Sequence, residues 1–194
     1  MMTTRNEGKT VFIAGSRGLS RLSAEVRQRL DNIIDKGLAV VVGDANGVDK
    51  AVQRYLSSRR YPNVAVFCMD GHCRNNVGQW PTRDISAANS SRRDFNYYST
   101  KDRAMVEEAD YGLMLWDGES RGTLRSVLDL VKHTKPTIVY VAPLKSFYSL
   151  RHPDELADML ARVNPAALGG IDSELKAFVM AGGSSPKSDN SRLF

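Results

Sequence analysis

The sequence predicts an α/β fold, a Rossmann-like parallel sheet of about five strands with helices on both faces. The first observation is a set of short, unbroken apolar runs, typical of buried parallel strands, at residues 10–15, 38–43, 63–69, 111–116 and 135–141. The second is the helical spacing of apolar residues between most of these runs. Alternating strands and helices predict right-handed βαβ units and therefore a parallel sheet covered on both sides.

The predicted helices are recognised by apolar side chains that recur every three or four residues. Residues 22–36 have this spacing, and Gly37 after them is a typical residue beyond a helix end. Residues 46–58, 101–109 and 121–132 continue the alternation between the strands. Only the third predicted strand is followed by a long segment without helical spacing.

The chain is predicted to form a single domain, because 194 residues suffice for one well-buried core and a small extension. This domain is expected to span residues 10–180. Its last part, residues 150–180, is expected to be a helical extension that closes with a short helix at residues 172–180. Residues 1–9 and 181–194 are expected to be flexible ends.

The segment at residues 70–100 is predicted to be a long loop, far longer than an ordinary connection between elements. It contains four arginines and four aromatic residues: Arg74, Arg83, Arg92, Arg93, Trp80, Phe95, Tyr97 and Tyr98. Arginine with aromatic side chains suits a base or a phosphate, so one interpretation is a ligand-binding loop. The other is an arm at a subunit interface.

Composition limits the classes of partner. The formal net charge is +5, and the excess is modest and scattered along the chain. An anionic partner is compatible with this charge, but nucleic acid is not favoured over an ordinary solvated surface. The longest apolar run, residues 138–144, is too short to span a bilayer, so no membrane is expected as a partner.

The two cysteines, Cys68 and Cys73, bear on the cellular compartment. Residues 1–9 are polar and lack the apolar core of a secretion signal. This combination favours reduced thiols in a cytoplasmic protein. With His72 the cysteines resemble metal ligands in type, but the cluster has no second pair, so no metal and no cofactor are expected.

Three predicted strands end in small-residue turns that open helices, at residues 15–18, 43–49 and 117–123. Ligands of parallel α/β sheets bind outside the carboxyl ends of the strands. A helix N-terminus there offers unpaired N–H groups and the positive end of a dipole, which favours phosphate. Neither G-x-G-x-x-G nor G-x-x-x-x-G-K-[ST] is present, which disfavours a hydride-transfer enzyme and a nucleoside triphosphatase.

Particular residues of these turns are candidate ligand contacts. Phosphate is expected to contact Gly15, Ser16, Arg17, Gly118, Ser120, Gly122 and Thr123. Arg17 can fork around a phosphate or cap a helix C-terminus, and Ser120 is also a good N-cap. Asp49 is expected to contact a sugar hydroxyl or base, or to bond amides in the first turn of its own helix. Further candidates are Gly43, Asp44, Gly47, Arg103 and Asp117. Arg103 is also placed to pair with Glu107.

Several of these motifs together resemble the SLOG superfamily. They are Gly15-Ser16-Arg17, G-x-x-x-G-V-D at residues 43–49, K-D-R-A-M at residues 101–105, and the turn at Gly122-Thr123. Members of that superfamily include the LOG, or lysine-decarboxylase-like, nucleoside-monophosphate phosphoribohydrolases and the DNA-processing protein DprA. The resemblance covers roughly residues 10–142 and is greatest to a small bacterial branch whose second turn has the sequence GGAxGxD. It implies nucleotide binding and a homodimer.

The resemblance also implies where catalysis would take place, and here the sequence departs from the pattern. Lys101 stands at the position of the family's catalytic arginine, and Ser126 at that of a glutamate expected to support cleavage of an N-glycosidic bond. Serine neither stabilises a cationic ribosyl centre nor activates water well. The catalytic residue is therefore open, with Lys101, Asp117 and Glu119 as candidates.

The expected function is binding of a nucleotide, or of a nucleotide-derived phosphate ligand, at the carboxyl edge of the sheet. Its enzymatic form would be hydrolysis of the N-glycosidic bond of a nucleoside monophosphate. One alternative is a nucleotide sensor without catalysis, which Ser126 favours. The other is a single-stranded DNA binder similar to DprA.

Overall fold

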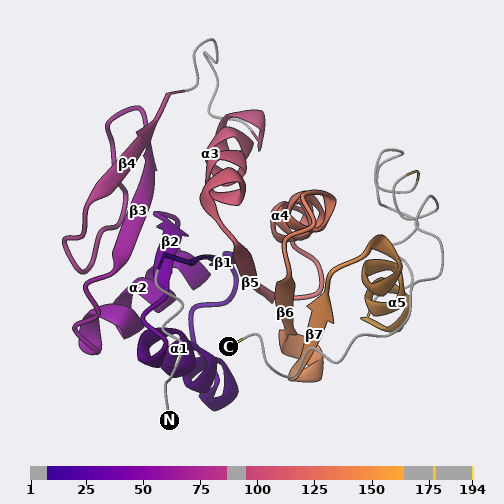
Figure 1. Ribbon diagram of the computed structural model, residues 1–194. Helices are drawn as coiled ribbons and strands as arrows, with labels where there is room; N and C mark the ends of the chain where they lie inside the picture. The colour runs from indigo at the N-terminus through magenta and orange to yellow at the C-terminus, as the bar shows by residue number, and fades with distance from the viewer. Residues whose placement is uncertain (1–7, 87–94, 164–176, 178–193) are drawn as a thin grey trace.

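All five apolar runs are strands of one sheet (Figure 1). The structure, a computed structural model, describes residues 8–86 and 95–163 together with Ala177 and Phe194. The predicted strands are β1 (Thr10–Gly15), β2 (Ala39–Gly43), β3 (Val64–Met69), β5 (Tyr111–Trp116) and β6 (Thr137–Val141). Two further strands, β4 (Thr82–Ile85) and β7 (Ser146–Leu150), extend the sheet at its edges.

The strand order is β4-β3-β2-β1-β5-β6-β7, and every neighbouring pair is parallel except β6 and β7. The helices are α1 (Ala24–Asp35), α2 (Val48–Ser58), α3 (Phe95–Glu108), α4 (Arg121–Lys132) and α5 (Pro153–Val163), and a 3-10 turn η1 occupies Ala142–Leu144. The Rossmann-like α/β prediction is confirmed.

Two apolar layers separate the sheet from its helices. In β1, Val11 and Ile13 pack into the layer beneath α1 and α2, whereas Phe12 packs into the layer beneath α3, α4 and α5. All three side chains are fully buried. A strand buried on both faces needs apolar residues at successive positions, which explains the unbroken runs in the sequence.

The strand order reverses between β1 and β5, and this reversal positions the candidate site. The N–H of Ser16 donates to the carbonyl oxygen of Leu115 at 2.9 Å, so the chain leaving β1 stays against β5. Gly15 is required there, because a Cβ at this position would lie 2.2 Å from the same oxygen. The helices α2 and α4 begin beside this junction, after β2 and β5 respectively.

The segment expected to be a long loop contains regular structure, so that prediction is wrong in part. Its middle holds β4, which pairs in parallel with β3, and its last residues form the first turns of α3. Between β3 and β4 the connection is anchored by Trp80, whose Nε1–H donates to the carbonyl oxygen of Tyr61 at 2.9 Å. Residues 87–94 lie outside the described part of the chain.

Other predictions also concern residues that the structure does not describe. Of the expected flexible ends, only residues 8, 9 and 194 are described, and of the expected helix at 172–180 only Ala177. Within the described part, α5 occupies the start of the predicted helical extension. No helix in that part combines the length and the apolar character needed to cross a bilayer.

The expectation of two reduced thiols is wrong for this structure. Cys68 at the end of β3 and Cys73 in the following connection form a disulfide, with their Cα atoms 4.9 Å apart. The β-bridge between Met69 and His72 turns the chain back on itself and brings the two cysteines together. Among the described residues no cluster of three or more metal-type ligands occurs.

Candidate functional site

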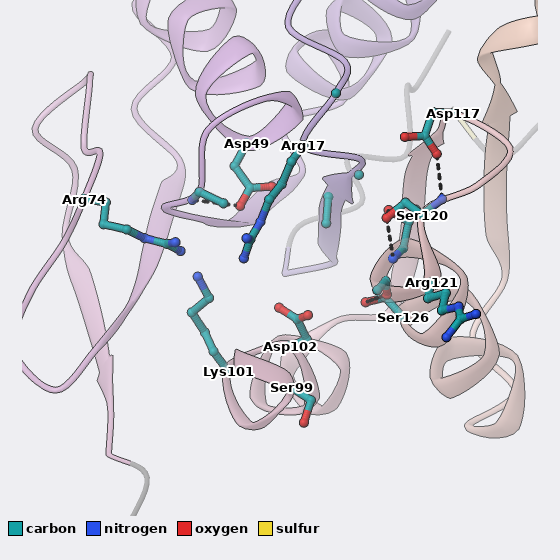
Figure 2. A pocket seen from close by; sticks show the side chains of 16 residues that line it. Arg17, Asp49, Arg74, Ser99, Lys101, Asp102, Asp117, Ser120, Arg121 and Ser126 are labelled. Atoms are coloured by element: carbon teal, nitrogen blue, oxygen red, sulfur yellow. Dashed lines mark hydrogen bonds between the residues drawn. The ribbon is translucent and has the colours of Figure 1, made fainter. Parts of the chain in front are cut away.

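A cavity of about 550 Å³ opens at the carboxyl ends of the central strands, where the strand order reverses (Figure 2). Its volume is in the range of ligand-binding clefts. All three predicted turns contribute to its wall, and so does the N-terminal half of α3, which the sequence did not single out as a wall of the site. Parallel α/β sheets bind ligands at this position.

In the first turn, Arg17 and Ser16 have different positions. Arg17 lines the cavity and its side chain points into it (Figure 2). Ser16 is fully buried behind the wall. Its Oγ accepts a hydrogen bond from the N–H of Asp117 at 3.1 Å and lies 3.3 Å from Oγ1 of Thr123. Ser16 therefore holds the first turn to the third and does not line the cavity.

Asp44 in the second turn is the centre of a buried charge cluster. Its Oδ1 accepts from Nζ of Lys101 at 2.5 Å and from Nη2 of Arg74 at 2.7 Å. Its Oδ2 accepts from Nε and from the backbone N–H of Arg74, at 3.1 and 3.0 Å. The carboxylate of Asp44 is thus occupied by protein groups, and Asp44 does not line the cavity.

The cluster is electrostatically balanced. The side chains of Asp44 and Lys101 are only 2% and 3% exposed, so each ion needs the other as partner. Burial alone would raise the pKa of Asp44, but hydrogen bonds from Arg74 and the positive charge of Lys101 hold that pKa well below its usual range. Lys101 also lines the cavity.

The connection after β3 carries Arg74 to the site because α2 holds it in place. Nε2 of Gln53 donates to the carbonyl oxygens of Gly43 and Asn75, at 2.8 and 3.2 Å. Its Oε1 accepts from the N–H of Val77 at 2.9 Å. Gln53 is fully buried, so one side chain fixes the end of β2 and the connection together.

Glycines of the second turn make room rather than contact a ligand. A Cβ at Gly43 would lie 2.4 Å from Oδ2 of Asp49 and 3.2 Å from Nζ of Lys101. Gly47 has a φ of +83°, and a Cβ there would lie 2.4 Å from the carbonyl oxygen of Arg17. Neither glycine lines the cavity. They let charged groups and the first turn approach the backbone.

Asp49 bonds a backbone amide of its turn and also borders the cavity. Its Oδ2 accepts from the N–H of Ala45 at 3.1 Å, which secures the turn before α2. The side chain also lines the cavity, although Asp49 is only 7% exposed. Burial raises the pKa of Asp49 to about 7, with the charge of Lys101 opposing the rise and that of Asp102 adding to it. Asp49 is therefore a carboxyl that holds a proton near neutral pH.

The protonation of Asp49 leads to a prediction for Asp49→Asn. Its pKa rises from 3.8 to about 7 on folding, so the folded state binds the extra proton and stability falls as pH rises between these values. Each pKa unit corresponds to about 1.4 kcal/mol, part of which a buried amide also costs. We expect the variant to be more stable by about 2 kcal/mol at pH 8. The gain should shrink toward pH 4.

Urea unfolding of both proteins at pH 5 and pH 8 measures this difference. A gain of equal size at both pH values would show that Asp49 is ionised to the same extent in the folded and unfolded states. The substitution keeps an acceptor for the Ala45 amide, so loss of the turn does not confound the comparison.

In the third turn, the Asp117 carboxylate accepts hydrogen bonds from backbone amides that the sequence analysis assigned to a ligand. Its Oδ1 accepts from the N–H groups of Glu119 and Ser120, at 3.0 and 2.8 Å. Ser120 is the N-cap of α4, with Oγ accepting from the N–H and the hydroxyl of Thr123 at 3.4 and 3.0 Å. Its N-cap interpretation is confirmed. Asp117, Ser120 and Thr123 all line the cavity.

The amides that remain for an anion belong to the first turn of α4. The N–H groups of Arg121 and Gly122 have no acceptor within the helix, since an α-helix leaves its first N–H groups unpaired. Both residues line the cavity. Gly118 has a φ of +89° and shapes the turn without lining the cavity. The third turn therefore leaves fewer amides without an acceptor than the sequence predicted.

Two predicted residues lie elsewhere. Arg103 and Glu119 are exposed and do not line the cavity. The predicted pairing of Arg103 with Glu107 is not among the ion pairs of the described residues. Glu119 therefore lies outside the cavity lining, whereas the other two catalytic candidates, Lys101 and Asp117, line the cavity.

Asp102 is the main residue that the sequence analysis missed. It is partly buried and lines the cavity beside Lys101, with Ser99 one turn earlier on α3 and Arg121 and Ser126 on α4. Burial raises the pKa of Asp102 to about 6, against the positive charges of Lys101 and Arg17. Only the orientation of α3 could have revealed it, because adjacent helix positions usually face different directions.

Comparisons with known proteins give a likeness in fold. No family model and no curated protein sequence matches the chain. Among solved structures, the chain is similar to the DNA processing protein A of Helicobacter pylori, which was studied for its single-stranded DNA binding mode. The TM-score is 0.54 at 17% identity, over 90% of this chain and 80% of that chain. At this identity the likeness shows the fold alone.

Proposed function

We propose that this chain is a SLOG-type protein that binds a nucleotide, or a nucleotide-derived phosphate ligand, in the cavity at the reversal of strand order. The observation that carries the proposal is the first turn of α4, which opens into a cavity that also receives the side chain of Arg17. Helix N-termini with a nearby guanidinium suit phosphate because dipole, amides and positive charge act together.

The charged groups that line the cavity predict how the proposed ligand is oriented in it. The α4 end of the cavity offers the amides of Arg121 and Gly122, whereas the opposite side presents Asp49 and Asp102. An ionised carboxylate repels phosphate, and carboxyls in either form accept hydrogen bonds from sugar hydroxyls and amino groups. We therefore expect the phosphate at α4 and the sugar or base toward Asp49 and Asp102.

Gly122→Leu tests the phosphate end. A nucleoside 5′-monophosphate present at a hundred times its Kd should raise the free energy of unfolding of the unmodified protein by about 2.7 kcal/mol. In the variant a side chain fills the space beside the first amides of α4, so the stabilisation should fall close to zero. Thermal unfolding with AMP, GMP, CMP and UMP measures both values.

Glu119→Leu is the matched control, because it adds the same bulk to the same turn at an exposed position outside the cavity. It should leave the nucleotide-dependent stabilisation intact. Stabilisation that survives in Gly122→Leu would place the phosphate elsewhere, and its absence in the unmodified protein with all four nucleotides would overturn the proposal. Gel filtration would test the expected homodimer in the same samples.

A second candidate is single-stranded DNA binding, which the likeness to the Helicobacter pylori protein supports. Contacts with the phosphate backbone release counterions, so such binding weakens steeply with salt. Retention of an oligo-dT strand at 50 mM salt that is lost at 200 mM, without stabilisation by any mononucleotide, would favour this candidate. Hydrolysis of the N-glycosidic bond remains the enzymatic form of the first proposal, and release of free base separates it from a sensor.

A further inference from the structure

We propose that Cys68 and Cys73 form a reversible redox switch that controls the cavity through Arg74. In the disulfide form, the covalent link holds the start of the connection after β3, and Arg74 with it, at the cavity wall. In the dithiol form this hold is lost and the cavity binds its ligand more weakly. The part of the inference that concerns ligand affinity rests on the nucleotide binding proposed above, and the part that concerns Arg74 does not.

The disulfide closes a small ring at the end of β3. Cys68 precedes Cys73 by five residues, and their Cα atoms are 4.9 Å apart. Between them the N–H of His72 donates to the carbonyl oxygen of Met69 at 3.0 Å, so the chain forms a local hairpin. Because the ring is short, the two thiols remain near each other after reduction, which favours re-formation of the bond.

Arg74 connects the disulfide to the cavity. It follows Cys73 directly in the chain, and its side chain is part of the cavity lining (Figure 2). Its backbone N–H donates to Oδ2 of Asp44 at 3.0 Å, and its Nη2 donates to Oδ1 at 2.7 Å. The first of these bonds comes from the peptide group that joins Arg74 to Cys73. Movement of Cys73 away from β3 therefore weakens the hold of Asp44 on Arg74.

The rest of the connection has anchors of its own. The N–H of Val77 donates to Oε1 of Gln53 at 2.9 Å, and the Nε1–H of Trp80 donates to the carbonyl oxygen of Tyr61 at 2.9 Å. These bonds lie beyond Arg74 in the chain and involve neither cysteine. Reduction should therefore loosen the residues next to the disulfide and leave the fold as a whole in place.

The two sulfur atoms differ in their access to solvent. Cys68 is 2% exposed within the apolar layer beneath α1 and α2. Cys73 packs against that layer and is partly exposed. Thiol–disulfide exchange depends on which sulfur a thiolate can reach. A small thiol should therefore attack Sγ of Cys73 rather than Sγ of Cys68.

The redox step balances with a low-molecular-weight thiol as the reductant. Its thiolate attacks Sγ of Cys73, the S–S bond breaks, and the electron pair stays on Sγ of Cys68, which takes up a proton. A second thiolate attacks the small-molecule sulfur of the mixed disulfide, and Cys73 leaves as a thiolate that is protonated in turn. The products are two protein thiols and one small-molecule disulfide, which is the oxidant in the reverse direction.

Hydrogen exchange in the full chain, followed by NMR, tests the hold on Arg74. The protein is compared after treatment with oxidised glutathione and after treatment with dithiothreitol, and thiol trapping verifies each state. The Arg74 amide should exchange at least about tenfold faster in the dithiol form, an effect within the constraint that a short disulfide ring supplies. The Val77 amide is the internal control and should change by less than about twofold, because Gln53 holds it.

Titration calorimetry of the same two forms with AMP, GMP, CMP and UMP measures the effect on the cavity. The nucleotide that binds should have a Kd at least about fivefold higher in the dithiol form, the lower end of ordinary coupling between two sites. Coupling is reciprocal, so a saturating nucleotide should shift the equilibrium constant between the disulfide and glutathione by the same factor. A disulfide without a connection to the cavity would show no such shift.

Three variants test the route from the disulfide to the cavity. Cys73→Ser removes the bond at the partly exposed position, so its Kd and its Arg74 exchange should match those of the dithiol form, with or without dithiothreitol. Arg74→Gln should bind weakly in both redox forms and lose the difference between them, because the transmitting side chain is absent. His72→Ser, at an exposed position of the same ring, is the matched control and should keep the full difference.

The outcomes separate the switch from the proposed function. A disulfide that dithiothreitol cannot reduce in the folded protein would overturn the inference, and so would equal exchange of the Arg74 amide in the two forms. An equal Kd in the two forms would also overturn it and leave nucleotide binding in place. Absence of binding by all four nucleotides in both forms would overturn the proposed function, and the exchange of Arg74 would still decide whether the disulfide holds that residue.

Discussion

Asp44→Ala is expected to lower the free energy of unfolding by about 3–5 kcal/mol, the cost of leaving a buried charge without its partner. The side chain of Lys101 is 3% exposed, and its Nζ lies 2.5 Å from Oδ1 of Asp44. Without that carboxylate it must lose its proton or draw water into the fold. Arg74 would lose the same acceptor, so the connection after β3 would loosen too. Urea unfolding at pH 7 measures the change.

Two comparisons isolate the buried pair. Lys9→Ala removes one partner of an exposed pair with Asp110, so its effect on stability should be small beside that of Asp44→Ala. Asp44→Ala combined with Lys101→Met removes both charges and keeps an apolar chain of similar length, so it should recover part of the lost stability. A loss for Asp44→Ala no larger than that for Lys9→Ala would mean that the pair is hydrated.

Gly15→Ala should have the next largest effect, a loss of about 3 kcal/mol, at the upper end of the cost of overpacking. The new Cβ would lie 2.2 Å from the carbonyl oxygen of Leu115 and 2.8 Å from Cγ2 of Val48. The first obstacle is backbone in the middle of the sheet, so the end of β1 must move away from β5. Thermal unfolding followed by circular dichroism measures the loss.

Gly18→Ala is the control from the same turn. Its nearest atom would be Oδ2 of Asp117 at 3.6 Å, an ordinary contact, so the change should be within about 0.5 kcal/mol. Equal losses for the two variants would point to the general loss of glycine from the turn rather than to the junction of β1 with β5.

The layered fold could be predicted from the sequence because buried parallel strands are apolar at every position. The two edge strands could not. The residues of β4 are exposed or partly exposed and include Arg83 and Asp84, so no apolar run marks it. In β7, Ser146 and Ser149 interrupt the apolar residues. An edge strand forms because a neighbouring strand is available to pair with it, and a local pattern does not record that neighbour.

The place of the cavity was also predictable, since strand ends followed by small residues are local features. The roles of individual side chains were harder to predict from the sequence. Ser16 and Asp44 lie in the predicted turns, but partners from distant parts of the chain occupy them: Thr123 for the first, and Arg74 and Lys101 for the second. Whether a polar group faces a ligand or a protein partner depends on tertiary contacts.

The carboxylate of Asp44 holds two segments of the cavity wall in place. It holds the connection after β3 through Arg74 and the helix α3 through Lys101, although these segments are far apart in the sequence. If that carboxylate is lost, both segments are released at once. We therefore expect local unfolding on this side of the cavity to be cooperative. The connection after β3 and the helix α3 should unfold and refold together.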